Sequence, residues 1–365
     1  MQLQLLKKQN LTPNANKNVW ALTFQFSENL SYAPGDWLTI KVENFPDLVN
    51  AVQQKLGIES HEVVELRRIG KVTVAQALTQ HLELSQLNPA ILNKLQRQYS
   101  DKLAGKYWED RQSMIQEAYG KDILDLLTQF PRLTELKLEF LNLLSPLAPR
   151  YYSIASSQQE SKNQVRILVR QIEYYQHDRV HYGVASNQLA QLNPGEKLEG
   201  EFLTNPNFKL PDDPKADILM LAAGVGLAPF IGFMAERKAQ QQAGKQVGQN
   251  WLFFGETHAN TTFLCKEKLQ KWQASGLLTL STAFSRDQQE KYYIQHRLMA
   301  QAEQVYAWIS RGAQIYVCGS KSRLAPAIET TLLQVLQQQT QLSLKEAEIK
   351  LQEMKQHKQL QMDVY

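Results

Sequence analysis

The carboxyl-terminal half of the sequence alternates short apolar runs with longer stretches that have helical spacing. The apolar runs are ILMLAAG at 218–224, WLFFG at 251–255, LTLSTAF at 278–284 and IYVCG at 315–319. Short runs of this kind are typical of strands that are buried on both faces. Strands that alternate with helices form βαβ units, in which the strands run parallel. The pattern therefore predicts an α/β doubly wound parallel-sheet domain over residues 211–365.

The same region ends in one more predicted helix. Ser343 and Glu346 have the spacing of a capping box, in which the two side chains satisfy N–H groups at the start of a helix. We expect this helix to lead into a short C-terminal tail with the sequence MDVY at 362–365.

The amino-terminal half begins with strand patterns. Apolar and polar residues alternate on either side of the turn sequence YAPGD at 32–36. Strand signals return at 151–155 and 165–172, and a short helix from about Ser186 and a turn at 193–195 follow them. The sequence therefore predicts an antiparallel β-barrel over residues 1–210. From about 46 to 144 the apolar residues have helical spacing instead, which predicts a helical insertion in the barrel.

Composition and charge exclude several classes of protein. The chain has 40 Lys and Arg residues against 36 Asp and Glu, and a net charge of +4 is too small to indicate a nucleic-acid binder. Its two cysteines, Cys265 and Cys318, form no CxxC or Cys/His cluster, so no metal site is predicted. Scarce cysteines are typical of the reducing cytoplasm, which is the expected location.

One uncharged stretch, at 218–235, approaches the length of a membrane span. Gly224, Gly226 and Pro229 interrupt it, so a buried strand, a glycine turn and a helix are a better interpretation. The first ten residues have no apolar run after their lysines, so no signal peptide is expected. We therefore predict no membrane span.

Gly224, Val225 and Gly226 lie between a predicted buried strand and a predicted helix. Small residues at this point let the pyrophosphate of a nucleotide approach the backbone N–H groups at the start of the helix. An ordinary tight turn between strand and helix has the same pattern, so the motif alone leaves both interpretations open.

The loop SRDQQEKYYIQ at 285–295 follows the third predicted strand of this domain. It offers a hydroxyl, a guanidinium, an ammonium and a phenol at the edge of a doubly wound sheet where ligands bind. Two cations there favour a nucleotide with a 2′-phosphate, because charged hydrogen bonds are worth about 1.5–3 kcal/mol each. The alternative is a solvated charged loop without a ligand.

In the barrel, the strand at 150–157 has the sequence RYYSIASS and places Arg150 and Tyr152 on one face. By itself this is an ordinary strand.

Together, six motifs resemble one family. RYYSIASS at 150–157, GVAS at 183–186, AGVGLAPF at 223–230, SRDQQEKYYIQ at 285–295, IYVCG at 315–319 and the final MDVY follow the order and spacing of diflavin reductases. The chain resembles the FAD/NADPH module, similar to ferredoxin–NADP reductases, that cytochrome P450 reductase shares with the flavoprotein alpha component of sulfite reductase. The terminal DVY is more similar to the latter. The flavodoxin-like FMN domain of those enzymes has no counterpart in this sequence.

The resemblance implies a site for FAD in the barrel domain. Arg150 would bind the pyrophosphate, Tyr152 would lie against the ring and Ser153 would lie near flavin N5. Tyr365 would stack on the flavin, where nicotinamide displaces it. The pyrophosphate would also be held at a helix start by Gly183, Val184, Ala185 and Ser186.

The resemblance also implies an NADPH site and a path for hydride transfer. Ser153, Cys318 and Asp363 would surround that path as catalytic residues. The NADP-binding residues would be Gly224, Val225, Gly226, Ser285, Arg286, Lys291, Tyr293, Gln295 and Cys318. The sequence departs from the family at Ala222, Ala223 and Val225, since the family usually has GPGTG there and the threonine hydroxyl is lost.

These features predict an NADPH-dependent FAD flavoprotein oxidoreductase. It would transfer a hydride from NADPH to FAD and pass electrons singly to a separate FMN-containing, flavodoxin-like protein or domain, or to a sulfite reductase haemoprotein. A free-standing NADPH–flavodoxin or ferredoxin reductase, or a diaphorase, is one alternative. A noncatalytic FAD-binding assembly protein, with a weakened nucleotide site at AAGVG, is another.

Overall fold

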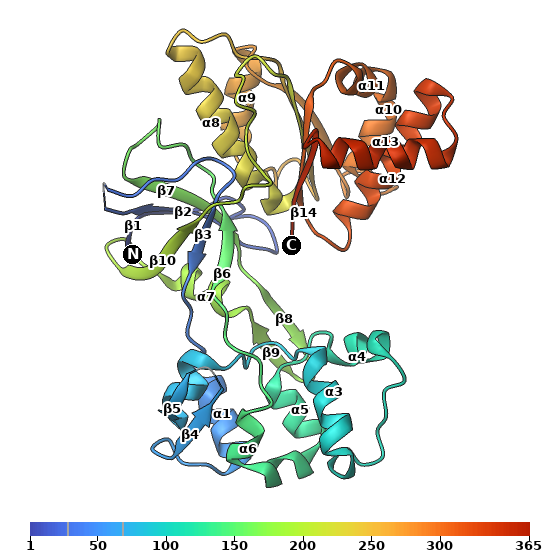
Figure 1. Cartoon of the computed structure of the whole chain (residues 1–365). Coiled ribbons are helices and arrows are strands. Elements are labelled where there is room, and N and C mark those ends of the chain that lie inside the picture. Colours follow the sequence, from blue (N-terminus) through green and yellow to red (C-terminus); the bar gives the residue numbers. More distant parts are fainter. Residues whose placement is uncertain (28, 68) are drawn as a thin grey trace. The chain divides into compact units, whose positions relative to one another are not determined.

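The structure is a computed structural model that describes residues 1–27, 29–67 and 69–365, and Figure 1 shows its elements. These residues form two compact units. The first unit consists of Met1–Thr39, Tyr151–Arg170 and Leu192–Tyr365, and the second of Ile40–Arg150 and Gln171–Gln191. The domain boundary expected between residues 210 and 211 lies within the first unit, and it stays a prediction.

Six strands of the first unit form a sheet in the order β6-β3-β10-β1-β2-β7. β1 pairs antiparallel with β2 and β10, and β2 pairs antiparallel with β7. A bridge between Ile154, directly after β6, and Ile167 of β7 joins the two edges of the sheet. The expected antiparallel barrel is thus confirmed. Its strands are β1 Gln2–Asn10, β2 Val19–Gln25, β3 Trp37–Ile40, β6 Arg150–Ser153, β7 Gln164–Arg170 and β10 Lys197–Leu203.

The turn before β3 explains the glycine in YAPGD. Gly35 has a φ of +95°, and a Cβ placed on it would lie 1.9 Å from the carbonyl oxygen of Phe208. The Asp36 side chain accepts a hydrogen bond from the N–H of Ala33 at 2.8 Å, which closes the turn. Only glycine combines this φ with so close an approach of two backbones. The turn therefore fixes where β3 begins.

The other strands of the first unit form a parallel sheet in the order β13-β12-β11-β14-β15. Four of them coincide with the four apolar runs, which confirms the expected doubly wound domain. The fifth, β15, was not expected, because the tail was interpreted as a short extension after the last helix. The strands are β11 Ile218–Ala223, β12 Asn250–Glu256, β13 Thr279–Phe284, β14 Gln314–Gly319 and β15 Leu360–Val364.

Helices cover both faces of this parallel sheet (Figure 1). Met220 and Ala222 of β11 pack in a core with α8 and α9, whereas Leu219 and Leu221 pack in a core with α10 to α13. Alternate residues of a strand point to opposite faces, so a strand buried twice is apolar throughout. The helices are α8 Ala228–Gln242, α9 Lys266–Ala274, α10 Ile294–Ala300, α11 Ala302–Ser310, α12 Leu324–Thr340 and α13 Leu344–Gln356.

Two of the sequence features in this region have the expected structure. The uncharged stretch at 218–235 forms β11, a 3-10 turn at Gly224–Leu227 and the first turns of α8. Ser343 and Glu346 form the capping box that begins α13. Among the described residues, the helices include none with both the length and the apolar character that a bilayer crossing needs.

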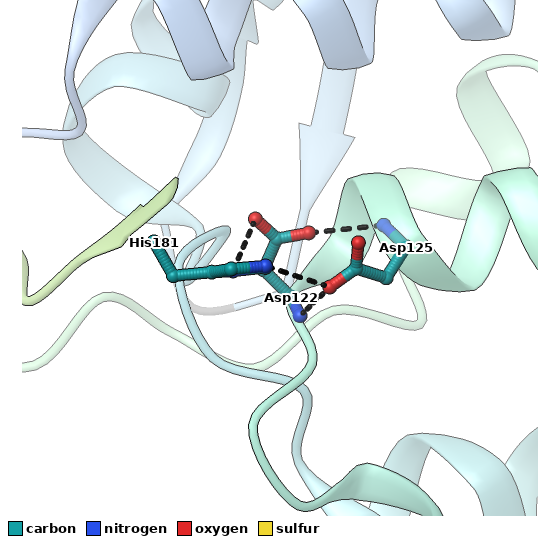
Figure 2. A group of neighbouring side chains, drawn as sticks. All are labelled: Asp122, Asp125 and His181. Carbon is teal, nitrogen blue, oxygen red and sulfur yellow. Dashed lines mark hydrogen bonds and ion pairs between the residues drawn. The ribbon is translucent and has the colours of Figure 1, made fainter. Parts of the chain in front are cut away.

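The second unit contains the helical insertion together with the hairpin β8–β9 and helix α7. Helix α5 illustrates how its helices begin: Asp122 caps the helix and accepts a hydrogen bond from the N–H of Asp125 at 2.9 Å (Figure 2). Its main elements are α1 Pro46–Leu56, β4 Val63–Leu66, β5 Gly70–Thr73, α2 Val74–Gln76, α3 Pro89–Gln98, α4 Arg111–Ala118, α5 Ile123–Gln129, α6 Leu138–Leu141, β8 Glu173–Gln176, β9 Arg179–Tyr182 and α7 Val184–Gln191.

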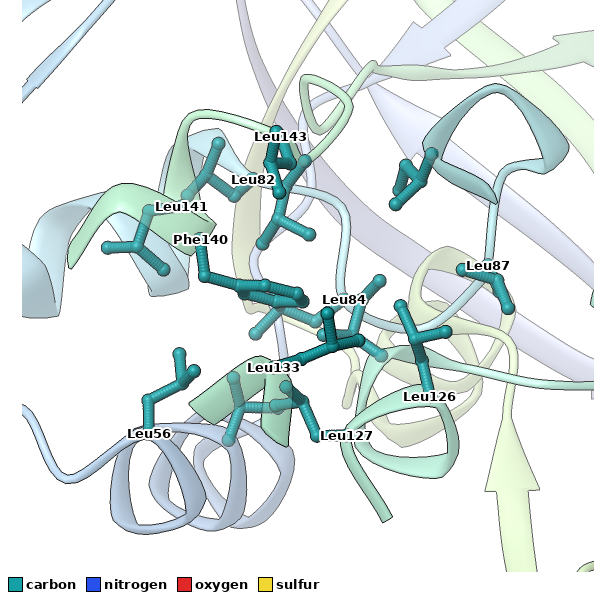
Figure 3. Packing of buried hydrophobic residues seen from close by; sticks show 14 of the residues in the cluster. Leu56, Leu82, Leu84, Leu87, Leu126, Leu127, Leu133, Phe140, Leu141 and Leu143 are labelled. Carbon is teal, nitrogen blue, oxygen red and sulfur yellow. The ribbon is translucent and has the colours of Figure 1, made fainter. Parts of the chain in front are cut away.

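Leucine side chains from these helices and from the segments between them form the core of the second unit (Figure 3). Phe140 lies among them, fully buried, with Leu84, Leu127 and Leu133 also at 0% exposure. Burial of side chains of this size stabilises the fold by about 1.5–3 kcal/mol each. The apolar positions that predicted helices are therefore the ones that hold the insertion together.

The second unit also contains elements that the sequence did not predict. The antiparallel pair β4–β5 lies inside the helical insertion, and β8–β9 forms a further hairpin. All four strands are only four residues long. Helix α7 begins at Val184 rather than at about Ser186. Alternation over so few residues is too short to distinguish a strand from a loop by pattern.

Candidate active site

The three predicted catalytic residues meet in the first unit at the ends of three strands. Cys318 of β14 and Asp363 of β15 are paired Cα neighbours in the parallel sheet. The Ser153 hydroxyl, at the end of β6, donates to Asp363 Oδ2 at 2.6 Å, and Cys318 Sγ lies 3.9 Å from the same oxygen. Ser153 and Cys318 thus share one carboxylate oxygen of Asp363, which lies 210 residues from Ser153 in the sequence.

This cluster is largely removed from water. Cys318 is fully buried and Asp363 is 8% exposed. Burial raises the pKa of Asp363, and hydrogen bonds from Ser153, Trp37 and Cys318 oppose that rise. Burial raises the pKa of the Cys318 thiol well above its usual range, and the nearby Asp363 charge adds to the rise. The cluster therefore offers a neutral thiol and a hydroxyl to one carboxylate.

Trp37 belongs to this cluster, although sequence reasoning missed it. Its indole Nε1–H donates to Asp363 Oδ1 at 3.1 Å. The residue follows the YAPGD turn directly, but no local pattern links it to the tail of the chain.

Tyr365 follows the cluster at the end of the chain. Its backbone is fixed, since its N–H donates to Gly319 O at 3.1 Å and an oxygen of its α-carboxyl group accepts from the N–H of Lys321 at 2.8 Å. The residue is nevertheless 62% exposed. An anchored backbone with an exposed ring fits a side chain that covers a flavin and moves aside.

The glycine turn Gly224–Leu227 lies at the carboxyl end of β11. Gly224 has a φ of +57°, and a Cβ on Gly226 would lie 2.1 Å from the carbonyl oxygen of Cys318. Around Gly224 the space is open: a Cβ there would meet only Glu256 Oε1, at 3.6 Å. Val225 packs against the core that α8 covers. The turn therefore has room for a phosphate group and offers it N–H groups at the start of a helix.

The loop at 285–295 lies at the same carboxyl edge of the sheet, after β13. Its start is fixed to the end of β12, because the N–H of Ser285 donates to Glu256 O at 2.8 Å and that of Arg286 to Thr257 O at 2.9 Å. Arg286 and Lys291 are exposed, and neither has an ion-pair partner among the described residues. The loop thus presents two cations to solvent.

Two further predicted nucleotide residues lie farther along this loop. Tyr293 is 41% exposed and stands directly before α10. Gln295, in the first turn of α10, lines a cavity of about 390 Å³ between α10 and α12. Glu256, which borders the glycine turn, was not among the predicted residues.

The predicted FAD residues are divided between the two units. Tyr152, Ser153 and Tyr365 belong to the first unit, whereas Arg150 and residues 183–186 belong to the second. In the second unit Arg150 pairs with the Glu83 carboxylate.

In α7 the first N–H that bonds back along the helix is that of Asn187, which donates to Gly183 O. The N–H groups of Val184, Ala185 and Ser186 come before it, in the first turn. Such groups are free to bind a phosphate. The Ser186 hydroxyl itself donates to Gly183 O and accepts from the N–H of Ile172. The backbone of this turn therefore fits a pyrophosphate better than the serine hydroxyl does.

A cluster of Asp122, Asp125 and His181 in the second unit has the residue types of a metal site (Figure 2). Arg179 occupies it, with Nη2 at 2.5 Å from Asp122 Oδ1 and 2.9 Å from Asp125 Oδ1. His181 is buried, and its Nδ1 lies 3.5 Å from Asp122 Oδ2. A guanidinium already pairs with both carboxylates, so the donor set fits an ion-pair network better than a divalent cation.

Comparison with known proteins identifies two modules. A family model described as FAD binding domain matches residues 1–188, and one described as oxidoreductase NAD-binding domain matches residues 220–330. The expected flavin and nicotinamide modules of an oxidoreductase are thereby confirmed.

Several curated relatives carry the same name, sulfite reductase (NADPH) flavoprotein alpha-component. The one from Vibrio cholerae is 38% identical over 338 residues, which are 92% of this chain and 54% of the relative. The one from Bacillus subtilis is 35% identical, with 92% and 56% covered, and the one from Serratia proteamaculans is 37% identical, with 99% and 60% covered. The chain thus spans little more than half the length of these relatives.

The resemblance seen in the six motifs is therefore supported along nearly the whole chain. Because the model described as FAD binding domain matches residues 1–188, more than half of the 365 residues, the chain belongs to the FAD binding domain family.

Proposed function

We propose that this chain is an NADPH-dependent FAD flavoprotein reductase that passes electrons one at a time to a separate acceptor. The observation that carries the proposal is the cluster of Ser153, Cys318 and Asp363 at the carboxyl edge of the parallel sheet. FAD, when bound, supplies the chemistry that accepts a hydride and releases single electrons.

The residues of the cluster would orient the reacting groups and control charge. The Asp363 carboxylate holds the Ser153 hydroxyl in one direction through a 2.6 Å hydrogen bond. The neutral Cys318 thiol adds no charge of its own beside the path. Because the cluster is buried, water is kept from the reacting atoms and the single carboxylate acts at low dielectric. Tyr365 would leave the flavin when nicotinamide enters.

The exposed loop at 285–295 supports a preference for NADPH over NADH. Arg286 and Lys291 are exposed and offer two cations for a 2′-phosphate, and Tyr293 offers a phenol. Ser285, which is also proposed for this site, is only 8% exposed. The N–H groups of the Gly224–Gly226 turn would bind the nucleotide's pyrophosphate. The starts of α7 and β6 would do the same for FAD, through residues 183–186 and Arg150. Residues 1–210 would form the FAD-binding domain and residues 211–365 the NADPH-binding domain.

The proposed acceptor is an FMN-containing, flavodoxin-like protein or domain, with a sulfite reductase haemoprotein as the final acceptor. The curated relatives are named as the flavoprotein alpha-component of a sulfite reductase, which supports a place in electron transfer to such an enzyme. Two free cysteines, Cys265 and Cys318, favour a cytoplasmic location. A free-standing reductase or diaphorase would use the same site with other acceptors, and assays with such acceptors distinguish the two.

One observation favours a noncatalytic flavoprotein instead. Val225 carries no hydroxyl at the turn, so one group that could bond to a nucleotide is missing. Its absence weakens a nucleotide site. The retained Ser153, Cys318 and Asp363 cluster weighs against this alternative.

An anaerobic titration of the FAD-loaded chain with NADPH and then NADH tests the proposal. We expect NADPH to bleach the flavin absorbance quickly and NADH to bleach it slowly. If FAD binds and neither nucleotide bleaches it, the reductase proposal fails and the noncatalytic alternative stands.

A further inference from the structure

Trp37 connects the barrel to the parallel sheet within the first unit. It is the first residue of β3, and its indole Nε1–H donates to Asp363 Oδ1 of β15 at 3.1 Å. The two residues are 326 positions apart in the sequence. Nothing in the predicted set of site residues includes this tryptophan.

The two oxygens of the Asp363 carboxylate have different partners. Oδ2 accepts the Ser153 hydroxyl at 2.6 Å and lies 3.9 Å from Cys318 Sγ. Oδ1 accepts the indole N–H of Trp37. A carboxylate bound on both oxygens cannot rotate about its last side-chain bond without losing a hydrogen bond. Trp37 therefore helps to fix the plane of the carboxylate, with one oxygen directed at Ser153 and Cys318 and the other at the indole.

The indole is itself held in place. Its ring meets the ring of Tyr151 edge-on, with centroids 5.8 Å apart and planes at 88°. The backbone carbonyl of Asp36, the residue before it, accepts the N–H of Ile154 at 3.2 Å, so the start of β3 lies beside the segment that carries Ser153. A tryptophan has few rotatable bonds and one rigid donor, which suits it to fixing another side chain.

We propose that Trp37 is a positioning residue for hydride transfer, which fixes the plane of the Asp363 carboxylate so that its second oxygen stays directed at Ser153 and Cys318. This inference rests on the proposed function. Trp37 acts through Asp363 rather than on a substrate or cofactor. It also joins the flavin-binding barrel to the last strand of the nucleotide-binding sheet at the point where both meet the reaction path.

Loss of the indole N–H would leave Oδ1 without a donor in a site that is 8% exposed. An unsatisfied buried anion is destabilised relative to its neutral form, so the pKa of Asp363 would rise. The titratable groups that face Asp363 are Cys318 of β14 and Tyr365. Arg170 of β7 in turn faces Tyr365. Burial keeps the Cys318 thiol neutral. A pH shift that differs between the wild type and the variant without the indole N–H would therefore belong to Asp363.

The test compares Trp37→Phe, which keeps an aromatic ring without the N–H, with Trp108→Phe. Trp108 Nε1 donates to Glu117 Oε2 at 3.2 Å in the second unit, so this control also loses one indole–carboxylate bond. For Trp37→Phe we expect flavin reduction by NADPH to slow about tenfold at neutral pH and to recover at alkaline pH. NADP⁺ affinity should stay unchanged, and Trp108→Phe should reduce its flavin at the wild-type rate.

A second readout does not depend on turnover. Carbon-13 NMR of labelled aspartate carboxyls, with Asp363→Asn to assign the signal, should show Asp363 titrating at higher pH in Trp37→Phe than in wild type. The inference is overturned if NADPH reduces the wild-type flavin and Trp37→Phe changes neither the titration of Asp363 nor the pH profile of flavin reduction. If the wild type itself is not reduced, the proposed function fails, and the role of Trp37 in hydride transfer fails with it, whatever the NMR titration shows.

Discussion

Lys17 and Glu256, 239 residues apart in the sequence, form an ion pair in which the ammonium lies 2.6 Å from both carboxylate oxygens. Lys17 lies in the loop between β1 and β2 of the barrel, and Glu256 ends β12 of the parallel sheet. The Glu256 side chain is 2% exposed and also accepts the N–H of Thr257 at 2.7 Å. The pair therefore joins the barrel to the edge of the sheet that carries the predicted nucleotide site.

Lys17→Met should weaken nucleotide binding. It leaves the Glu256 carboxylate uncompensated beside Gly224, where a pyrophosphate would approach, so the negative charges would repel. We expect the dissociation constant for NADP⁺ to rise about tenfold and the free energy of unfolding to fall by about 1–3 kcal/mol. Titration of flavin absorbance with NADP⁺ and urea unfolding measure the two effects.

The double variant Lys17→Met with Glu256→Gln is the matched control for this change. Removing both charges should restore most of the nucleotide affinity, because the unpaired carboxylate is gone. Equal loss of affinity in the single and double variants would show that the charge of Glu256 is not responsible.

The sequence predicts the parallel sheet well because its apolar runs are local signals. Strands buried on both faces, such as β11 with Leu219 and Met220, are apolar without interruption. The strand β15 has the sequence LQMDV and carries two polar residues, and it becomes a strand only by pairing with β14. Its pairing is a tertiary event, and no local pattern indicates it.

The hairpin β8–β9 was missed for a different reason. Its turn places His177 and Asp178 at φ values of 50° and 58°. Turns of this kind are usually recognised by Asn-Gly or Asp-Gly, and a His-Asp pair gives no such signal.

The site residues likewise divide into those with a local sequence signal and those without one. Motifs locate Ser153, Cys318 and Asp363 because each stands at a recognisable place in its own segment. Trp37, Lys17 and Glu256 act through partners more than 200 residues away. Such contacts depend on how two sheets pack, and a single sequence does not show this.

Arg286 and Lys291 should determine the choice between NADPH and NADH. When both residues are changed to alanine, we expect the preference for NADPH over NADH to fall by about a hundredfold or more, because two charged hydrogen bonds disappear. Reduction by NADH should change little. The measurement is the ratio of kcat/KM for the two nucleotides with an artificial acceptor.

Lys350→Ala is a suitable control for that experiment. Lys350 is an exposed cation of α13 whose partner is Glu353, at 3.5 Å. The same loss of preference in Lys350→Ala would attribute the effect to net charge rather than to the loop.

Asp363→Asn should slow flavin reduction by about hundredfold or more while FAD stays bound. The amide keeps the shape of the side chain but removes the negative charge at the buried cluster, where low dielectric makes that charge most effective. Rapid-mixing spectrophotometry with NADPH measures the reduction step, and the flavin-to-protein absorbance ratio measures binding. A variant that reduces at the wild-type rate would remove Asp363 from the reaction path.

Glu117 should contribute to stability in the second unit in a pH-dependent way. Burial raises its pKa, but hydrogen bonds from Lys121, Gln129 and Trp108 outweigh this and lower the pKa from 4.5 to about 2. A lowered carboxyl pKa stabilises the fold above the unfolded-state value and loses that contribution as pH falls toward the folded-state value. Glu117→Gln should therefore lower the free energy of unfolding by about 1–3 kcal/mol at neutral pH, after allowance for solvent screening, and by much less near about pH 2.

Urea unfolding of the wild type and Glu117→Gln at both pH values measures this difference, with Glu135→Gln as the control. Glu135 also pairs with basic residues, Lys102 and Arg132, but its side chain is 52% exposed. Exposed pairs are screened by water, so the control should change stability little at either pH. If the two variants lose equal stability at neutral pH, the effect depends on charge removal in general, and the buried contacts of Glu117 are not its cause.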